Sequence, residues 1–263
     1  MSEGSLLFLG TGASSGIPVI GCSCKVCSSS NPKDKRLRTS ALVRYDQKNY
    51  LIDCGPDARI QALSHHIDRL DALIVTHTHF DHIGGLEELR IYNFYHQKPI
   101  ECLLSKESFD EVQQLFFYLF QQHHEKKNYT SQFAFHPVSE HCGEMVLAGL
   151  PVRYFSYYQG DMKVLGVRFG DLAYMTDIKS FTDDVFQFLD GISTLVISAL
   201  RFTPSHLHLT IDEAVDFVSK TTAKNSYFIH LSHEIEHNHV ASLLPEGKGV
   251  HLAYDGLQIP FRI

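Results

Sequence analysis

Residues 72–85 of the chain read ALIVTHTHFDHIGG, and this stretch predicts both the fold class and the chemistry of the protein. It opens with a short apolar run of the kind found in a strand buried in the middle of a layered sheet. Four metal-binding side chains follow at once, namely His77, His79, Asp81 and His82. Three imidazoles and a carboxylate within six residues, at the end of a strand, are hard to explain as packing. The pattern favours a metal site over a cluster of surface histidines.

The spacing of these side chains predicts a site for two metal ions. On one loop, His77 and His79 can point to one metal while Asp81 and His82 point to a second. Two metals about 3.5–4 Å apart that share a water or hydroxide are typical of metal-dependent hydrolases. One loop cannot complete both coordination spheres, so the remaining ligands are expected at later strand ends.

Three later segments offer such ligands. Asp177 and His230 each follow the end of a strand-like run, and His206 and His208 follow a third. A single Asp or His at a strand end is usually a cap or a surface group. Three such positions in a chain that already carries the histidine motif favour a role at the metal site.

A second motif is the cysteine cluster of Cys22, Cys24 and Cys27, which has the spacing C-x-C-x2-C. Three thiolates need one more ligand to form a tetrahedral zinc site. His233 lies three residues after His230 and is free to supply that ligand. We expect a structural zinc that ties the N-terminal loop to the C-terminal part of the active-site wall. A redox-active thiol cluster is the alternative.

Composition and charge narrow the class of protein. The chain has 263 residues, 44% of them hydrophobic and 20% charged, which is an ordinary globular composition. A net charge of −7 argues against broad binding to nucleic acid or to anionic lipid. No apolar run approaches the roughly 18 residues that span a bilayer, and residues 1–5 lack the basic segment of a signal peptide. We therefore expect a cytoplasmic protein with a small-molecule substrate and no membrane partner.

The order of expected strands and helices indicates one α/β domain over residues 1–263. Strand-rich segments and helices alternate and then do so again, which favours layered sheets with helices outside. A helix is expected over residues 107–122 because its apolar residues have helical spacing. Strands at residues 250–253 and 257–259 are expected to form a closing pair.

Two helical segments carry further signals. Thr210 and Glu213 form a capping-box pattern at the start of the helix expected over residues 211–221. The end of the helix expected over residues 107–122 has an aromatic face made of Phe116, Phe117, Tyr118 and Phe120. Such a face is typical of core packing or of a homodimer contact, and the sequence leaves both open.

These motifs resemble the signatures of the metallo-β-lactamase superfamily, whose H-x-H-x-D-H motif stands at residues 77–82. Residues 10–27, GTGASSGIPVIGCSCKVC, are similar to the N-terminal signature of the PhnP-like, phosphoribosyl cyclic phosphodiesterase-like hydrolases. Further similar stretches are 51–57 (LIDCGPD), 173–177 (AYMTD), 230–233 (HLSH) and 253–256 (AYDG). The resemblance covers nearly the whole chain. It implies a four-layer αββα sandwich in one domain, with metals at one edge between the two sheets.

The resemblance also implies how the candidate ligands divide between two catalytic metals, either zinc or manganese. His77 and His79 would hold the first metal, and Asp177 would bridge the two. The remaining ligands, which would hold the second metal, are Asp81, His82 and His230.

Other roles follow from the same resemblance. His208 matches the family's catalytic histidine, which contacts phosphate and protonates the leaving oxygen, and Asp81 is the other residue expected to be catalytic. The cysteine cluster together with His233 matches the family's structural zinc site. Asp53 and Asp57 are expected to orient the metal ligands from outside or to close the loop around the site.

One position departs from the family pattern. Gln159 stands where a third histidine for the first metal is expected. An amide oxygen is a poorer donor than imidazole for transition metals. We therefore expect the first metal site to be weak, or to be filled only in the presence of substrate.

The expected activity is that of a metal-dependent phosphodiesterase, which cleaves a small cyclic or nucleotide-like phosphodiester with a metal-bound hydroxide while His208 acts as general acid. A tRNA 3′-processing ribonuclease of the same fold would need a long basic arm, which the sequence lacks, so nucleic acid is not the expected substrate. A thioesterase or β-lactamase would lack the cysteine site. A noncatalytic metal-binding sensor is the alternative from a different class, and Gln159 is the feature in its favour.

Overall fold

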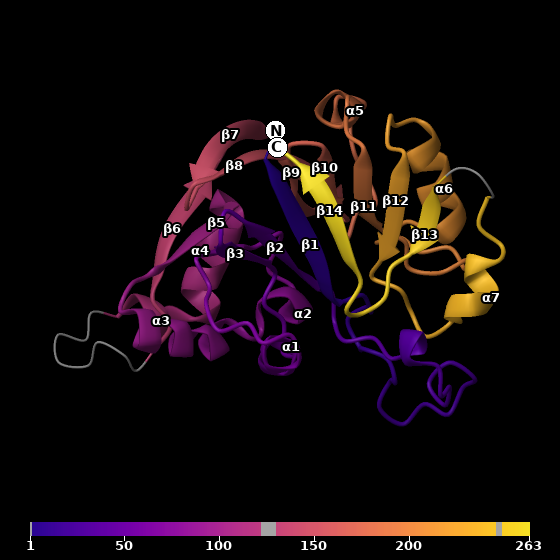
Figure 1. Cartoon of the computed structure of the whole chain (residues 1–263), viewed down its shortest axis with the longest axis horizontal. Coiled ribbons are helices and arrows are strands. Elements are labelled where there is room, and N and C mark those ends of the chain that lie inside the picture. Colours follow the sequence, from indigo (N-terminus) through magenta and orange to yellow (C-terminus); the bar gives the residue numbers. More distant parts are fainter. Residues whose placement is uncertain (1, 122–129, 246–248) are drawn as a thin grey trace.

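Two seven-stranded β-sheets pack against each other in the computed structural model, which describes residues 2–121, 130–245 and 249–263 (Figure 1). The first sheet has the strand order β14-β1-β2-β3-β4-β5-β6. Strands β3 to β6 pair in parallel, whereas β14, β1, β2 and β3 pair antiparallel. The bounds are β1 (Glu3–Gly10), β2 (Ser40–Tyr45), β3 (Lys48–Ile52), β4 (Ala72–Ile74), β5 (Ile100–Ser105), β6 (Phe133–Val138) and β14 (Gln258–Arg262).

The second sheet has the order β13-β12-β11-β10-β9-β8-β7. Strands β10 to β13 pair in parallel, and β7 to β10 pair antiparallel. The bounds are β7 (Cys142–Leu147), β8 (Leu150–Gln159), β9 (Met162–Phe169), β10 (Leu172–Met175), β11 (Thr194–Ser198), β12 (Asn225–Ile229) and β13 (Val250–Leu252). Strands β1 to β6 from the first half of the chain form one mixed sheet, and β7 to β13 from the second half form the other. The last strand, β14, joins the first sheet.

Helices lie on the outer face of each sheet (Figure 1). Those on the first sheet are α1 (Ala58–Ser64), α2 (Phe80–Ile83), α3 (Arg90–His96) and α4 (Lys106–Leu115), with 3₁₀ turns η2 (Leu86–Leu89) and η3 (Phe117–Phe120). Those on the second are α5 (Val185–Phe188), α6 (Ile211–Ser219) and α7 (His237–Ala241). A further 3₁₀ turn, η1 (Pro32–Asp34), lies in the N-terminal loop. The expected four-layer αββα sandwich is confirmed.

Strand β1 shows why the layers form. Its side chains alternate, so that Leu6 and Phe8 enter the apolar layer between the sheets while Leu7 and Leu9 face the helices. The second sheet adds Val167 to the same central layer. Each large apolar side chain removed from water in this way contributes roughly 1.5–3 kcal/mol to stability. Because each sheet has apolar side chains on both faces, one face packs against the other sheet and the opposite face packs against helices.

Two expectations about the elements are wrong in detail. The strands expected to close the fold as a pair lie in different sheets, since β13 pairs with β12 and β14 pairs with β1. The helix expected over residues 107–122 ends at Leu115, and its last residue lies outside the described residues. The break lets Phe120 stack on Phe135 of β6, with the ring centroids 5.2 Å apart.

The capping box at the start of α6 is confirmed, because the hydroxyl of Thr210 accepts from the backbone of Glu213 and the carboxylate of Glu213 accepts from that of Thr210. Of the aromatic face beside α4, Phe116 and Phe120 pack into the outer core of the first sheet, whereas Phe117 is exposed. Within residues 2–121, 130–245 and 249–263, no helix has the length and apolar character needed to cross a membrane.

Candidate metal centre

The candidate ligands lie on segments that directly follow parallel strands, all of them loops except for Asp81 and His82, which lie on the short helix α2. Asp53 comes directly after β3, the motif that starts at His77 follows β4, Asp177 follows β10, and His230 comes directly after β12. Because parallel strands present their carboxyl ends at the same edge of a sheet, side chains at these positions are brought together. The expectation that distant strand ends meet is confirmed by the distances between their side chains.

Three of these residues have a left-handed backbone. The φ angles are +60° at Asp53, +54° at Asp177 and +56° at His230. This region is unfavourable for residues other than glycine, and each such residue costs roughly 1–3 kcal/mol. Strain of this kind persists only where the surroundings impose it, and it clusters at functional sites. The backbone thus turns sharply at the strand ends that carry the candidate ligands.

Ligand atoms of Asp81, His82 and His230 lie within 4.8 Å of one another, and Oδ1 of Asp177 lies beside the two histidine nitrogens. Nε2 of His82 lies 3.3 Å from Oδ2 of Asp81 and 3.6 Å from Oδ1 of Asp177. Nε2 of His230 lies 3.5 Å from Oδ2 of Asp81 and 3.4 Å from Oδ1 of Asp177. Ligand atoms at about 2.0–2.1 Å from a tetrahedral metal are about 3.3–3.4 Å apart. Asp81, His82 and His230 therefore have the spacing of one metal-binding site, the second set of the predicted pair, and Oδ1 of Asp177 is close enough to the two histidines to join them.

A first set lies on the other side of Asp177. Nε2 of His77 lies 3.0 Å from Nδ1 of His79 and 3.6 Å from Oδ2 of Asp177. The side-chain nitrogen of Gln159 lies 3.1 Å from that same Oδ2. Asp177 thus presents one carboxylate oxygen to each set, which is the arrangement that a bridging ligand requires.

Hydrogen bonds behind the ligands fix their orientation. Oδ2 of Asp53 lies 2.7 Å from Nδ1 of His82, and the backbone N–H and the hydroxyl of Thr76 both donate to Asp53. Because the hydroxyl proton of Thr76 goes to Asp53, its oxygen accepts from Nδ1 of His77 at 3.0 Å. Both histidines therefore keep Nε2 free for a metal. Asp57 instead accepts from Arg38, so it closes the neighbouring loop and does not orient a ligand.

The carboxylates and imidazoles of the centre shift one another's pKa values. Burial alone would raise the pKa of Asp177, but the surrounding imidazoles, His230 foremost, lower it well below its usual range. Burial would lower the pKa of His82, yet Asp177 and Asp53 raise it well above its usual range. In the described part of the chain, the ion-pair partners of Asp53, Asp81 and Asp177 are all histidines.

Several buried atoms of the second set have no hydrogen-bond partner among the described residues. They are Oδ2 of Asp81, Nε2 of His82 and Nε2 of His230. A buried polar atom left in this state costs about 1–3 kcal/mol. A divalent metal would satisfy all three at once, and imidazole nitrogens with carboxylate oxygens are suitable donors for zinc, manganese or iron. The residues present therefore fit a metal.

His208 lies beside the shared carboxylate. Its ring stacks on that of His230, with the centroids 4.9 Å apart, and its Nδ1 lies 3.9 Å from Oδ2 of Asp177. Burial, together with the neighbouring His230, lowers the pKa of His208 to about 4. His206, the other histidine of the same loop, is exposed. The loop thus brings one of the two candidate histidines to the metal centre.

The cysteine cluster also converges. Nδ1 of His233 lies 3.3 Å from Sγ of Cys22, 3.7 Å from that of Cys24 and 3.6 Å from that of Cys27. A tetrahedral zinc with S and N ligands at about 2.3 and 2.0–2.1 Å separates them by about 3.6 Å. Hydrogen bonding from the backbone of Cys27 lowers the pKa of Cys24 to about 6, which favours the thiolate. The four residues fit a zinc ion.

Two contacts of the centre had no signal in the sequence. The hydroxyl of Thr78, within the histidine motif, donates to the carboxylate of Glu111 on α4. The amide nitrogen of Gln159 reaches both Asp177 and His208, from which its distances are 3.1 and 3.0 Å. Neither contact follows from spacing along the chain, because the partners come from separate elements.

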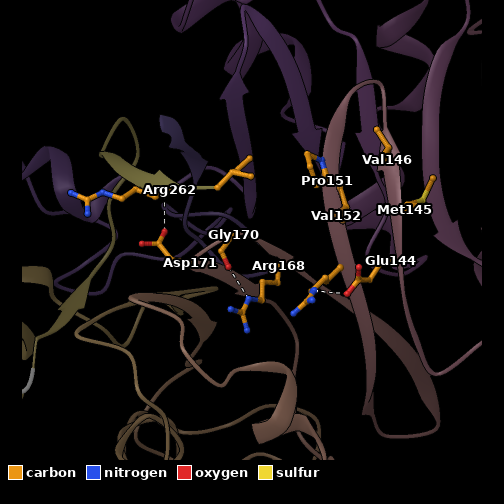
Figure 2. Close-up of a pocket in the computed structure, with 11 residues that line it drawn as sticks. Glu144, Met145, Val146, Pro151, Val152, Arg168, Gly170, Asp171 and Arg262 are labelled. Atoms are coloured by element: carbon orange, nitrogen blue, oxygen red, sulfur yellow. Dashed lines mark hydrogen bonds and ion pairs between the residues drawn. The ribbon is translucent and has the colours of Figure 1, made fainter. Parts of the chain in front are cut away.

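A cavity of about 760 Å³ lies elsewhere, beside β7, β8 and the C-terminal strand (Figure 2). Two of its three arginines are engaged, since Arg168 donates to backbone carbonyls of Gly170, Phe188 and Asp190, and Arg153 pairs with Glu144. The cavity contains none of the candidate metal ligands. This cavity is therefore separate from the metal centre.

Comparisons with known proteins agree with this geometry. The family model of the beta-lactamase superfamily domain matches residues 48–231. A solved structure described as a new diphosphatase from the PhnP family superposes with a TM-score of 0.90 and 37% identity, covering 98% of this chain and 97% of that one.

Curated relatives match over parts of their length. An octanoyltransferase of Porphyromonas gingivalis is 34% identical over 261 residues, which is 96% of this chain but 50% of that protein. The anti-Pycsar protein Apyc1 of Bacillus phage 010DV004 is 47% identical over 62 residues, covering 22% of this chain and 24% of that protein. The chain thus spans about half the length, or less, of these curated relatives.

Proposed function

The chain belongs to the beta-lactamase superfamily, among its PhnP-like members, and from this premise we propose that it is a metal-dependent phosphodiesterase. Membership supports a metal-dependent hydrolase. The proposed substrate is a small cyclic or nucleotide-like phosphodiester. The proposed metals are two zinc or manganese ions at the centre around Asp177, with one structural zinc at the cysteine cluster.

One observation carries the proposal: two sets of ligand atoms share the carboxylate of Asp177, and His208 lies next to that carboxylate. Bound divalent metals would polarise a phosphoryl oxygen and lower the pKa of water, which is the chemistry that phosphodiester hydrolysis requires. Charge on the equatorial phosphoryl oxygens needs compensation, and a centre rich in buried imidazoles and carboxylates is built to hold cations.

The chain's own residues take the remaining roles. Asp53 and Thr76 hold the imidazoles of His82 and His77 so that Nε2 of each faces the centre. His208 gives a proton to the leaving oxygen. An anionic phosphodiester beside its ring favours the protonated form, because an opposite charge within a few ångströms stabilises it. Most of His208 is buried, which limits exchange of its proton with bulk water.

A diphosphatase is the second candidate, and the similar PhnP-family structure described by that word favours it. Cleavage of a diphosphate and of a phosphodiester both break a P–O bond and need the same charge compensation. The name octanoyltransferase belongs to a protein of which this chain matches half, so it assigns no activity to the matched half. The net charge of −7 argues against a ribonuclease that holds tRNA.

The experiment is a substrate panel with purified protein, stripped of metal and then reloaded with manganese or zinc. The panel contains bis(p-nitrophenyl) phosphate, cyclic nucleotides, a cyclic sugar phosphate and a nucleoside diphosphate. We expect metal-dependent hydrolysis of at least one diester at a higher kcat/KM than of the diphosphate. The reverse order would make the protein a diphosphatase. Tight metal binding without turnover of any member would favour the noncatalytic sensor.

A further inference from the structure

Gln159 holds an unusual position at the metal centre. Its side chain is 3% exposed and its amide nitrogen donates to Oδ2 of Asp177 at 3.1 Å. The same nitrogen lies 3.0 Å from Nε2 of His208. Its carbonyl oxygen, Oε1, is buried and has no hydrogen-bond partner among the described residues.

The two partners of the amide nitrogen fix the orientation of the amide. An amide turned by 180° would place Oε1, which can only accept, against the carboxylate oxygen of Asp177, which also can only accept at neutral pH. The orientation with the nitrogen toward Asp177 is therefore the favourable one. Oε1 is attached to the same carbon as that nitrogen, so it lies close to the carboxylate of Asp177 and has no hydrogen-bond partner among the described residues.

Unsatisfied buried atoms also occur away from the centre, in Arg36, Ser226 and His237, so this state indicates a metal ligand only where other ligand atoms lie close by. Oδ2 of Asp81, Nε2 of His82 and Nε2 of His230 share it with Oε1 of Gln159, and those three converge on one point at metal-ligand spacing. The first set offers only His77, His79 and one oxygen of Asp177. The second set has Asp81, His82 and His230 with Oδ1 of Asp177 beside the two histidine nitrogens, so the first set has one protein ligand fewer.

We propose that Oε1 of Gln159 is the fourth protein ligand of the first metal, and that it shifts this site toward harder divalent cations such as manganese. Carbonyl oxygens suit manganese better than imidazole does, whereas imidazole suits zinc. The amide is neutral, as imidazole is, so the change of donor alters the metal preference without altering the charge of the site. The inference rests on the metal centre of the proposed function but not on its substrate.

The test compares Gln159→His and Gln159→Leu with the unaltered chain, by calorimetric titration with manganese and with zinc in the absence of substrate. The binding event assigned to the first set is the one that His79→Ala abolishes. Gln159→His should raise zinc affinity at that event by roughly tenfold or more while changing manganese affinity far less. Gln159→Leu, which has a similar size and no donor, should weaken both metals there.

Cobalt gives a direct readout of coordination. In the cobalt-loaded protein, Gln159→His should change the visible d–d absorption bands, since one oxygen donor becomes nitrogen. The inference would be overturned if neither variant changed the manganese affinity or the zinc affinity of the unaltered chain and the cobalt spectra were also unchanged. This holds even if phosphodiesterase activity is found. Loss of the proposed activity with the predicted metal preference intact would overturn the function alone. Circular dichroism shows whether each variant is folded. If Gln159→Leu does not fold, Gln159→His alone tests the inference.

Discussion

Oδ2 of Asp53 lies 2.7 Å from Nδ1 of His82, and both side chains are shielded from solvent. A carboxylate behind a ligating imidazole fixes the tautomer and orientation of the ring and raises its basicity. The contact joins the end of β3 to the histidine motif after β4, so it couples the fold of the first sheet to the metal centre.

Replacing Asp53 with asparagine should therefore weaken the second metal. The amide is a weaker acceptor for the N–H of His82, and outer partners of this kind are typically worth 10–100-fold in metal affinity. Calorimetric titration with zinc measures the effect. Asp57→Asn is the matched control, because Asp57 contacts Arg38 and no candidate ligand. Equal losses in both variants would contradict the assigned role of Asp53.

The cysteine cluster predicts one zinc that is needed for stability and not for chemistry. Cys24→Ser removes a thiolate that lies 3.7 Å from Nδ1 of His233, so the protein should lose about one zinc per chain and melt at a lower temperature. Elemental analysis and thermal unfolding check this. Cys142→Ser, at a half-buried position in β7, should keep the zinc. Unchanged zinc content in Cys24→Ser would show that the cluster is a set of free thiols.

His208 is predicted to act in turnover. His208→Ala should lower kcat by roughly 10²–10⁴-fold, the usual contribution of a positioned acid or base, while the metal content stays the same. His206→Ala is the control, since His206 is exposed on the same loop. If His208→Ala loses a metal, His208 is a ligand. If His206→Ala is the variant with the large effect, the catalytic histidine has been assigned to the wrong position.

The capping box of α6 allows a prediction about stability alone. Thr210→Ala removes the acceptor for the N–H of Glu213 and should lower the free energy of unfolding by about 0.5–2 kcal/mol. Urea denaturation measures this change. Ser219→Ala, at the opposite end of the same helix, should stay within about 0.5 kcal/mol of the unaltered chain. Metal affinity should be the same in both variants.

The sequence predicts most of the centre because its chemistry is local. His77 and His79 lie on the loop after β4, Asp81 and His82 lie on the short helix α2 that follows it, and Asp177 and His230 each follow a short apolar strand. Strand ends in a layered α/β fold lie at a common edge, so their meeting follows from the element order. The resemblance to a known family adds the division of these residues between two metals, which spacing alone leaves open.

The remaining features depend on contacts between distant segments. The pairing of β14 with β1 joins the two ends of the chain, and nothing near residues 250–263 marks it. Helix α4 ends at Leu115, and beyond that break Phe120 stacks on Phe135, a residue of another element. The orientation of Gln159 is set by Asp177 and His208, which lie on two further loops. Local periodicity carries no information on such contacts.

The most direct test of the account is the rate of bis(p-nitrophenyl) phosphate hydrolysis before and after metal removal. Chelator-treated protein should lose its activity, and addition of manganese or zinc should restore it, because two ligand sets that share Asp177 hold the cations on which the chemistry depends. Asp177→Asn should bind these metals poorly and should not be rescued by them. An equal rate in the metal-free protein, or full activity in Asp177→Asn, would contradict the proposal that the centre is the catalytic site.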